Sequence, residues 1–147
     1  MNKAYIQKLK ENATIPTQGS KYAAGYDLYA CLDEDIIIAP GEVGKIGTGV
    51  AITPPEGTFG AIYARSGLAT KSGLRPANCV GVCDYDYTGE YIVPLRNDDD
   101  APHLIKNGDR IAQLVFAPYL AIEFEEVNEL KPTERGSGGF GSTGINN

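Results

Sequence analysis

The sequence has no tryptophan, one histidine and one methionine, and only three of its 147 residues are cysteine. A single histidine, His103, offers little for a histidine-based zinc site or a serine–histidine pair. Its Pro-containing surroundings predict a surface residue in a turn. The cysteines Cys31, Cys79 and Cys83 form no CxxC motif. On one extended strand, Cys79 and Cys83 would have Cα atoms about 13 Å apart, too far for a disulfide, so we expect reduced, structural thiols.

Basic residues and long apolar runs are also scarce. Lys and Arg total 13 against 19 Asp and Glu, which gives a net charge of −6 and a pI of about 4.7. Nucleic acids and anionic membranes usually require a basic surface, so we expect neither as a partner. No apolar run approaches the ~20 residues of a membrane span, and no signal-peptide core is visible. We therefore expect a cytoplasmic protein. Because its net charge is negative, it should hold any anionic substrate with local arginines.

Glycine is abundant, with 18 residues, and hydrophobic residues make up 42% of the chain. Helical periodicity is nearly absent, whereas short β-rich runs recur between Pro and Gly turns. This pattern predicts one all-β sandwich or barrel, with one short helix at 66–70. We expect residues 1–127 to form the core domain and 128–147 an arm. The predicted strands are 4–9, 26–30, 36–39, 50–53, 58–64, 91–95, 111–116 and 122–127.

The C-terminal stretch 135–144 contains five glycines within ten residues, together with Arg135, Phe140, Ser142 and Thr143. Glycine lets the backbone come close to a ligand, and exposed N–H groups and hydroxyls suit phosphate oxygens. Phe140 offers a face on which a base can stack. Taken alone, such a segment is more typical of a disordered, low-complexity tail.

Four patches upstream favour the functional interpretation. Gly25-Tyr26-Asp27-Leu28 places an acid in an apolar strand, and Arg65-Ser66-Gly67 offers a guanidinium, a hydroxyl and open N–H groups to a phosphate. Residues 78–90 predict a hairpin with two acids, and 108–114 begin a strand with Arg110 and Gln113. Singly, each patch has a structural explanation: a turn cap, a surface ion pair or a solvated turn.

In this order the five patches resemble the five sequence boxes of the trimeric deoxyuridine triphosphate nucleotidohydrolases (dUTPases), from Gly19 to Gly144. The resemblance implies a distorted jelly-roll β-barrel, a homotrimer that exchanges C-terminal arms, and Mg²⁺-dependent hydrolysis of dUTP to dUMP and pyrophosphate. Each site would take the phosphate boxes from one subunit, the uracil hairpin from a second and the glycine-rich arm from a third.

The resemblance also implies roles for single residues. Asp84 matches the general base, Tyr87 the aromatic beneath the deoxyribose, and Asn78 with the Gly81 backbone the uracil reader. Asp27 matches an acid that touches the metal through water, and Arg110 and Asp86 match supporting residues. The remaining residues are expected to contact the substrate's phosphates or, from the arm, its base. They are Arg65, Ser66, Gly67, Gln113, Arg135, Gly139, Phe140, Ser142 and Thr143.

These residue types suit the chemistry. A carboxylate can accept the proton of a water that attacks the α-phosphorus. Mg²⁺ keeps several waters and binds substrate phosphates, so no dense carboxylate cluster is needed. If Asp84 and Asp86 lie on an extended strand, their side chains point to opposite faces, and we expect Asp86 to matter less. A narrow hairpin would reject the thymine methyl by clash and cytosine by mismatched hydrogen bonding.

Three features depart from the expected pattern. Arg96 stands where the family usually has an apolar or aromatic residue, which puts the local packing or subunit contact in question. Pro94 cannot donate to a ladder, so its strand should have an unpaired side there. The run Asp98-Asp99-Asp100 predicts a solvated loop, with a cation or partner site as the alternative.

Two other functions stay open. A dCTP deaminase shares the fold, but its catalytic glutamate would fall on Pro94 here, and the zinc signature of the other deaminases is missing. A dUTP-gated regulatory protein that binds another protein is the second alternative.

Overall fold

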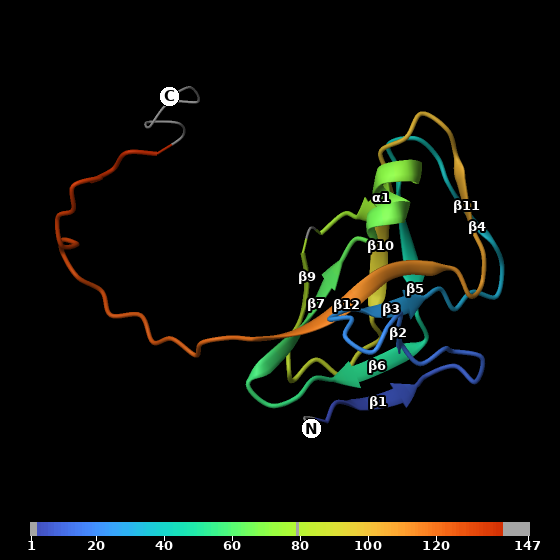
Figure 1. Cartoon of the computed structure of the whole chain (residues 1–147), viewed down its shortest axis with the longest axis horizontal. Helices are drawn as coiled ribbons and strands as arrows, with labels where there is room; N and C mark the ends of the chain where they lie inside the picture. The colour runs from blue at the N-terminus through green and yellow to red at the C-terminus, as the bar shows by residue number, and fades with distance from the viewer. Residues whose placement is uncertain (1–2, 79, 140–147) are drawn as a thin grey trace.

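The computed structural model describes residues 3–78 and 80–139. Its fold is all-β, as expected: a strand-built body from which a long C-terminal segment runs away (Figure 1). Seven of the eight expected strands are present. The elements are β1 (Tyr5–Lys8), β2 (Thr17–Gln18), β3 (Tyr26–Tyr29), β4 (Ile36–Ile38), β5 (Val43–Gly47), β6 (Val50–Thr53), β7 (Thr58–Tyr63), α1 (Ser66–Ser72), β8 (Leu74–Pro76), β9 (Gly81–Cys83), β10 (Ile92–Asn97), β11 (His103–Ile105) and β12 (Arg110–Pro118).

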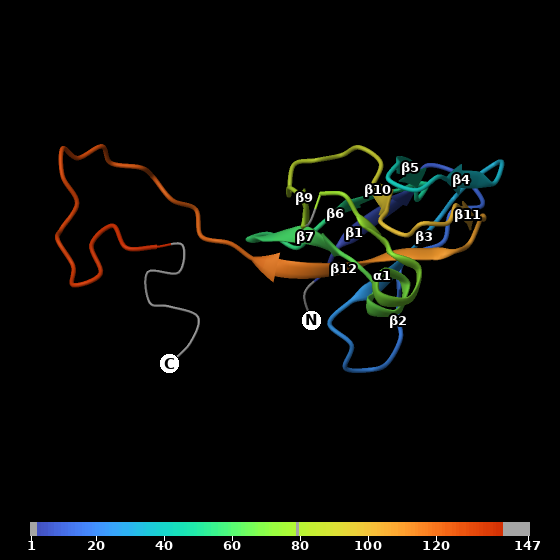
Figure 2. The ribbon, with the colours of Figure 1, turned by 90° about the horizontal axis from the view of Figure 1, so that it is seen from above.

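The largest sheet has the strand order β2-β3-β12-β7-β9, with antiparallel neighbours throughout. Its centre is β12, the long strand that crosses the body in Figure 2. In this register Gln113 lies opposite Asp27 of β3 on one side and opposite Tyr63 of β7 on the other. The pairing thus joins two of the sequence patches, and a third, which begins at Arg65, follows directly after β7.

Smaller sheets complete the body: β5-β10-β8, β1-β6 and β11-β4. The core lies between the sheets. Along strands such as β10, buried side chains that point into this core alternate with more exposed ones. Leu28, Ile46, Val93, Leu95 and Leu114 are almost completely buried. Among the described residues, no helix has the length and apolar character that a membrane span requires.

The expected helix at 66–70 exists and extends to Ser72, where Gly73 ends it with a φ of +61°. Five short strands were not among the predicted strands: β2, β5, β8, β9 (which lies within the predicted hairpin) and β11. Their two to five residues are too few for a clear alternation, and β5 includes glycines while β8 includes a proline. Tertiary pairing forms them where local sequence preference is weak.

The expected strand at 122–127 is wrong. The chain leaves the sheet after Pro118, and residues 122–127 have no regular structure (Figure 1). Ile122 and Phe124 are 67% and 93% exposed. A strand requires a hydrogen-bonded neighbour, and none lies beside this segment in the described part of the chain. The division into a core of 1–127 and an arm of 128–147 stays a prediction.

Pro94 has the predicted effect on its strand. On the β8 side the ladder covers only Leu95, Arg96 and Asn97 and stops next to Pro94. The Pro94 carbonyl still accepts a hydrogen bond of 2.7 Å from the Ala77 N–H. On the β5 side the pairing continues past Pro94 without interruption.

The acidic run forms a surface loop, as expected, but two of its carboxylates are paired. Asp98 contacts Nε of Arg75 at 2.5 Å and Nε of Arg96 at 2.7 Å. The hydrogen bond from Arg96, followed by that from Arg75, lowers the pKa of Asp98. The unusual Arg96 is therefore a partner of this loop.

His103 was expected in a turn, and this expectation is wrong, because His103 opens strand β11 opposite Ile38. The chain bends before it instead, at Asp99, Asp100 and Ala101. Its Nε2 lies 2.8 Å from Oδ2 of Asp99. That contact, with the Asp100 backbone N–H, lowers the pKa of Asp99.

Candidate functional site

A cavity of about 710 Å³ opens where β3, β12 and the junction of β7 with α1 meet. The cause is the register of β12, which places Gln113 between Asp27 and Tyr63. The chain turns from β7 into α1 directly after Tyr63, so Arg65 and Ser66 reach the same cavity. Its polar lining includes Asp27, Arg65, Ser66, Arg110 and Gln113, so the fold brings these patches together.

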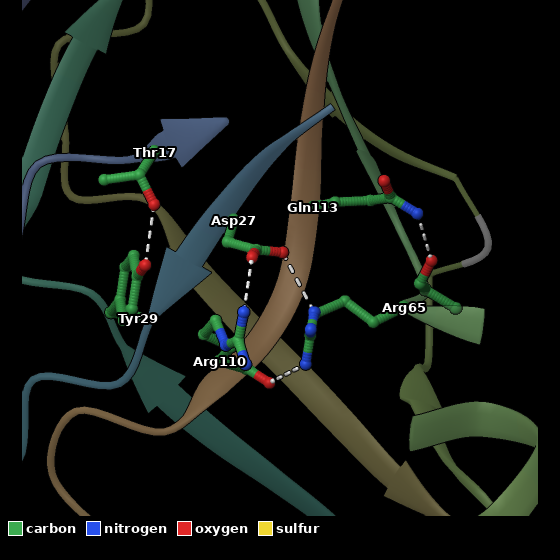
Figure 3. A network of polar contacts seen from close by, with 7 residues as sticks. Thr17, Asp27, Tyr29, Arg65, Arg110 and Gln113 are labelled. Carbon is green, nitrogen blue, oxygen red and sulfur yellow. Dashed lines mark hydrogen bonds and ion pairs between the residues drawn. The ribbon is translucent and has the colours of Figure 1, made fainter. Parts of the chain in front are cut away.

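Asp27 holds two arginines at this cavity (Figure 3). Its Oδ1 accepts a hydrogen bond of 2.9 Å from Nε of Arg65, and its Oδ2 accepts one of 3.3 Å from Nη1 of Arg110. Nη1 of Arg65 also donates to the Arg110 carbonyl at 3.2 Å. The Asp27 side chain is only 16% exposed. Two guanidinium groups and one carboxylate leave a local positive charge in a chain of net charge −6, which suits an anionic ligand.

Gln113 is fixed within the same cavity. Its Nε2 donates a hydrogen bond of 2.8 Å to the Ala64 carbonyl (Figure 3). Gly25 lies against its amide, since a Cβ at Gly25 would be 2.3 Å from Oε1 of Gln113. A side chain at position 25 would displace the Gln113 amide, so the glycine of the first patch serves the glutamine of the fourth. The second N–H of the Gln113 amide can then be donated to a ligand in one defined arrangement.

Ser66 and Gly67 lie at the start of α1, and both line the cavity. Arg65 precedes the helix in an extended conformation, with a φ of −82° and a ψ of 126°. A Cβ at Gly67 would have no atom within 4 Å, so the backbone here is open to an approaching group. The Ser66 carbonyl accepts a hydrogen bond from Oγ1 of Thr70, which ties this turn to the helix.

The predicted hairpin begins with the edge strand β9, which pairs with β7. A Cβ at Gly81 would be 3.2 Å from Nδ2 of Asn78, so the amide of Asn78 lies close over this glycine. The two residues expected to read uracil are therefore neighbours.

The expectation that Asp84 and Asp86 point to opposite faces of a strand is wrong. The strand ends at Cys83, and the Tyr87 N–H donates to the Asp84 carbonyl at 3.2 Å, which makes residues 84–87 a tight turn. Both acids line a second cavity of about 540 Å³, together with Phe59, Val82, Tyr85 and Tyr119. The alternation of side chains applies only to extended backbone, and the turn removes it.

Tyr87 follows this turn and packs against a buried aromatic ring. Its ring centroid lies 6.3 Å from that of Tyr91, with an angle of 27° between the planes. Tyr91 is 1% exposed, and burial raises its pKa.

Burial also raises the pKa of the neighbouring Cys83 thiol to about 11. Cys83 and Cys31 are free, buried thiols, as expected, whereas Cys79 lies outside the described residues.

The two cavities have no lining residue in common among those described. Within one chain, Asp84 therefore does not face the cavity of Arg65 and Gln113.

Arg135 lies on the exposed C-terminal segment, where its Nε donates to the Gly138 carbonyl at 2.8 Å. Gly139 follows on the same segment, whereas Phe140, Ser142 and Thr143 lie outside the described residues.

Sequence reasoning did not single out Phe59, Glu90, Tyr91 and Tyr119, although they contact the hairpin or line its cavity. Glu90 stands in the hairpin patch itself and could have been found there. Phe59 and Tyr119 are single aromatic residues with no local pattern, and only the fold places them near Asp84.

Among the residues that the structure describes, no three His, Cys, Asp or Glu side chains gather as metal ligands. Both oxygens of Asp27 accept from arginines. Each oxygen keeps a further lone pair, which is compatible with an indirect contact to a metal through water.

Comparison with known proteins places these residues in context. The sequence model of a family described as dUTPase matches residues 11–144. A deoxyuridine 5'-triphosphate nucleotidohydrolase of Desulfitobacterium hafniense is 49% identical over 143 residues, covering 97% of this chain and 94% of the relative. The protein of the same name from Leptospira interrogans is 43% identical over 143 residues, covering 97% and 99%.

Solved structures give the same result. A dUTPase of Staphylococcus bacteriophage 80alpha with dUpNHpp has a TM-score of 0.85 and 31% identity, covering 99% of this chain and all of that one. A dUTPase from phage phi11 of S. aureus has a TM-score of 0.80 and 28% identity, covering 89% of this chain and all of that one. The phi11 structure is described as revealing the coordination of a structural Mg(II) ion.

Proposed function

The chain belongs to the dUTPase family, and from this premise we propose that it hydrolyses dUTP to dUMP and pyrophosphate with Asp84 as the general base. The observation that carries the proposal is the cavity of Asp27, Arg65, Ser66 and Gln113. The fold there joins three distant patches into one basic site of about 710 Å³. The named relatives support the same reaction for this chain.

In this proposal the cavity binds the phosphate chain. Asp27 orients Arg65 and Arg110, so their charge is already in place when negative charge develops on the phosphoryl oxygens. Ser66 and the amide of Gln113 add neutral hydrogen bonds that fix the position of the phosphates. Mg²⁺, which dUTPases generally use, would neutralise phosphate charge when bound.

The hairpin supplies the base and the nucleoside contacts. Asp84 accepts the proton of the attacking water, Tyr87 supports the deoxyribose, and Asn78 with the Gly81 backbone reads uracil. The tight turn at 84–87 fixes Asp84 and Tyr87 relative to one another. Because of this fixed arrangement, binding of the deoxyribose by Tyr87 would also position Asp84 to activate the water.

We assign the active assembly to a homotrimer in which each site combines three chains. The separation of the two cavities within one chain supports this assignment. The C-terminal arm, with Arg135, Gly139, Phe140, Ser142 and Thr143, would cover the substrate bound to another subunit.

The test is a pyrophosphate-release assay with dUTP, dCTP, dTTP and UTP at equal concentrations in the presence of Mg²⁺. We expect fast release from dUTP and at most slow release from the other three. Ammonia release from dCTP without pyrophosphate from dUTP would replace the proposal by a deaminase.

A second role, regulation of a partner protein by bound dUTP, is compatible with the same site. Phage dUTPases of similar structure are described as controlling the transfer of virulence genes by a G protein-like mechanism. A pull-down from lysate with and without a dUTP analogue tests this role, and dUTP-dependent capture of one partner would support it.

A further inference from the structure

We propose that Glu90 is a positioning residue for the sugar subsite, and that it sets the discrimination between deoxyribose and ribose nucleotides. Its carboxylate joins the turn between β5 and β6 to the segment that carries Tyr87. The inference rests on the proposed function, because Tyr87 can act on a sugar only if the chain binds the nucleotide.

Tyr87 is held by the residues that follow it. Its hydroxyl donates a hydrogen bond of 2.9 Å to the Glu90 carbonyl. A Cβ at Gly89 would lie 2.5 Å from that hydroxyl oxygen, so the ring lies directly over Gly89. With the stacked ring of Tyr91 behind it, Tyr87 takes its position from the backbone of 89–91. Any shift of Glu90 must therefore shift Tyr87.

Glu90 is in turn held by a turn that is distant in sequence. Its Oε1 accepts a hydrogen bond of 2.8 Å from the Gly49 N–H, across 41 residues. Gly47 makes room for this contact, since a Cβ there would be 2.6 Å from Oε1 of Glu90. Glu90 is half-buried, so water competes less for this hydrogen bond than at an open surface.

The same turn is rigid on its other side. Gly49 has a φ of +68°, and a Cβ there would lie 2.8 Å from both Cβ of Ala13 and Sγ of Cys31. Both of these residues belong to the core. The Gly49 N–H is therefore a fixed donor, and Glu90 is the side chain that transmits its position to the hairpin.

Residue 91 is tied to this turn as well. Oγ1 of Thr48 donates to the Tyr91 carbonyl at 2.6 Å, and the Tyr91 N–H donates to the Val50 carbonyl at 2.9 Å. These two bonds hold the backbone after Glu90 without its side chain. Loss of the carboxylate should thus loosen residues 87–90 while the core end of the segment stays in place.

A loosened Tyr87 would admit a 2′-hydroxyl that the fixed ring excludes. The readout is the ratio of kcat/KM for dUTP to kcat/KM for UTP. Partial unfolding lowers both values equally and cancels in the ratio. We expect Glu90→Ala to lower the ratio about 10- to 100-fold, the scale of a misplacement of about 1 Å, and Glu90→Gln, which keeps an acceptor oxygen, to restore most of it.

Two further variants complete the test. Gly47→Ala keeps the charge of Glu90 but displaces its carboxylate, so the ratio should fall even if Glu90→Ala fails to fold. Glu42→Ala is the matched control, because Glu42 also accepts from a backbone N–H, that of Ala39, at a turn away from the hairpin. We expect it to keep the wild-type ratio.

The two proposals fail in different ways. An unchanged ratio in both Glu90→Ala and Gly47→Ala, alongside a relaxed ratio in Tyr87→Ala, overturns the positioning role and leaves the enzyme intact. A wild-type protein that releases no pyrophosphate from dUTP overturns the proposed function and the positioning role with it.

Discussion

Asp84 is the residue on which turnover should depend most. We expect Asp84→Asn to lower kcat by roughly 10²–10⁴, the usual contribution of a positioned base, with little change in dUTP binding. Asp86→Asn should have a smaller effect, because Asp86 lies in the middle of the turn, two residues further than Asp84 from the end of the anchoring strand β9. Pyrophosphate release and dUTP titration measure both variants. Equal losses would mean that the two acids in this cavity act together.

Gly25 offers a test of the phosphate cavity through a single methyl group. Gly25→Ala should push the Gln113 amide away, because the new Cβ would meet Oε1 at 2.3 Å. A hydrogen bond to a charged group contributes about 1.5–3 kcal/mol, so KM for dUTP should rise by roughly 10- to 100-fold. Gly19→Ala is the control, since its Cβ would have no atom within 4 Å. A KM for Gly25→Ala equal to that of the control would remove Gln113 from the substrate contacts.

For single residues, the sequence predicted those whose function can be inferred from the few residues around them. Asp27, Arg65 and Gln113 stand in recognisable patches, and the structure brings them together. The sequence could not predict that Asp27 binds Arg65, because 38 residues separate them. The role of Glu90 depends likewise on Gly49, whose N–H becomes a partner only when β5 and β6 pack beside the hairpin.

Among the elements, β12 shows what patterns can and cannot predict. Its β-rich run predicted a strand, but its two neighbours, β3 and β7, follow only from the folded register. Residues 122–127, in which Ile122 and Phe124 alternate with glutamates, form no strand, since nothing pairs with them in the described chain. Composition thus reports the capacity for a strand, whereas a partner decides whether one forms.

The loop that precedes β11 should make stability depend on pH. The folded pKa of Asp98 lies below its ordinary value of 3.8, so its ion pairs stabilise the fold above that pH and are lost as pH falls below it. We expect Asp98→Ala to melt below the wild type at pH 7, and the difference to shrink below pH 3.8. Melting curves by circular dichroism from pH 7 to pH 3 measure this.

Asp100→Ala is the matched control from the same loop. The Asp100 carboxylate has no ion pair with any described residue. Its melting temperature should follow the wild type at every pH. A constant difference between Asp98→Ala and the wild type across the whole range would show that backbone changes in the loop, and not ionisation, cause the loss.

For the whole molecule, we expect a homotrimer at micromolar concentration. The C-terminal segment carries side chains that a monomer would leave in water: Leu120, Phe124 and Leu130 are 83%, 93% and 80% exposed. Large exposed apolar side chains that recur along one segment are typical of a surface that binds a partner. Sedimentation equilibrium should give three times the 15.7 kDa chain mass. Phe124→Ser should shift it towards smaller species, whereas an active wild-type monomer would contradict the trimer.

The end of the arm can be separated from assembly. A chain truncated after Glu134 should remain a folded trimer but lose nearly all activity, because it lacks Arg135 and the glycine-rich stretch and keeps every strand of the body. Circular dichroism, sedimentation and pyrophosphate release together distinguish this outcome from misfolding. Full activity in the truncated chain would show that the substrate does not need this cover.

The position of β12 also determines when the protein can fold during its synthesis. The central strand of the largest sheet is the last strand of the body to be translated, so β3 and β7 leave the ribosome without the neighbour that separates them. Edges of unpaired strands attract other chains, and pairing over a long sequence distance is slow. A nascent chain of this protein is therefore most exposed to aggregation just before β12 emerges, and chaperones that bind apolar strands should act on it in that interval.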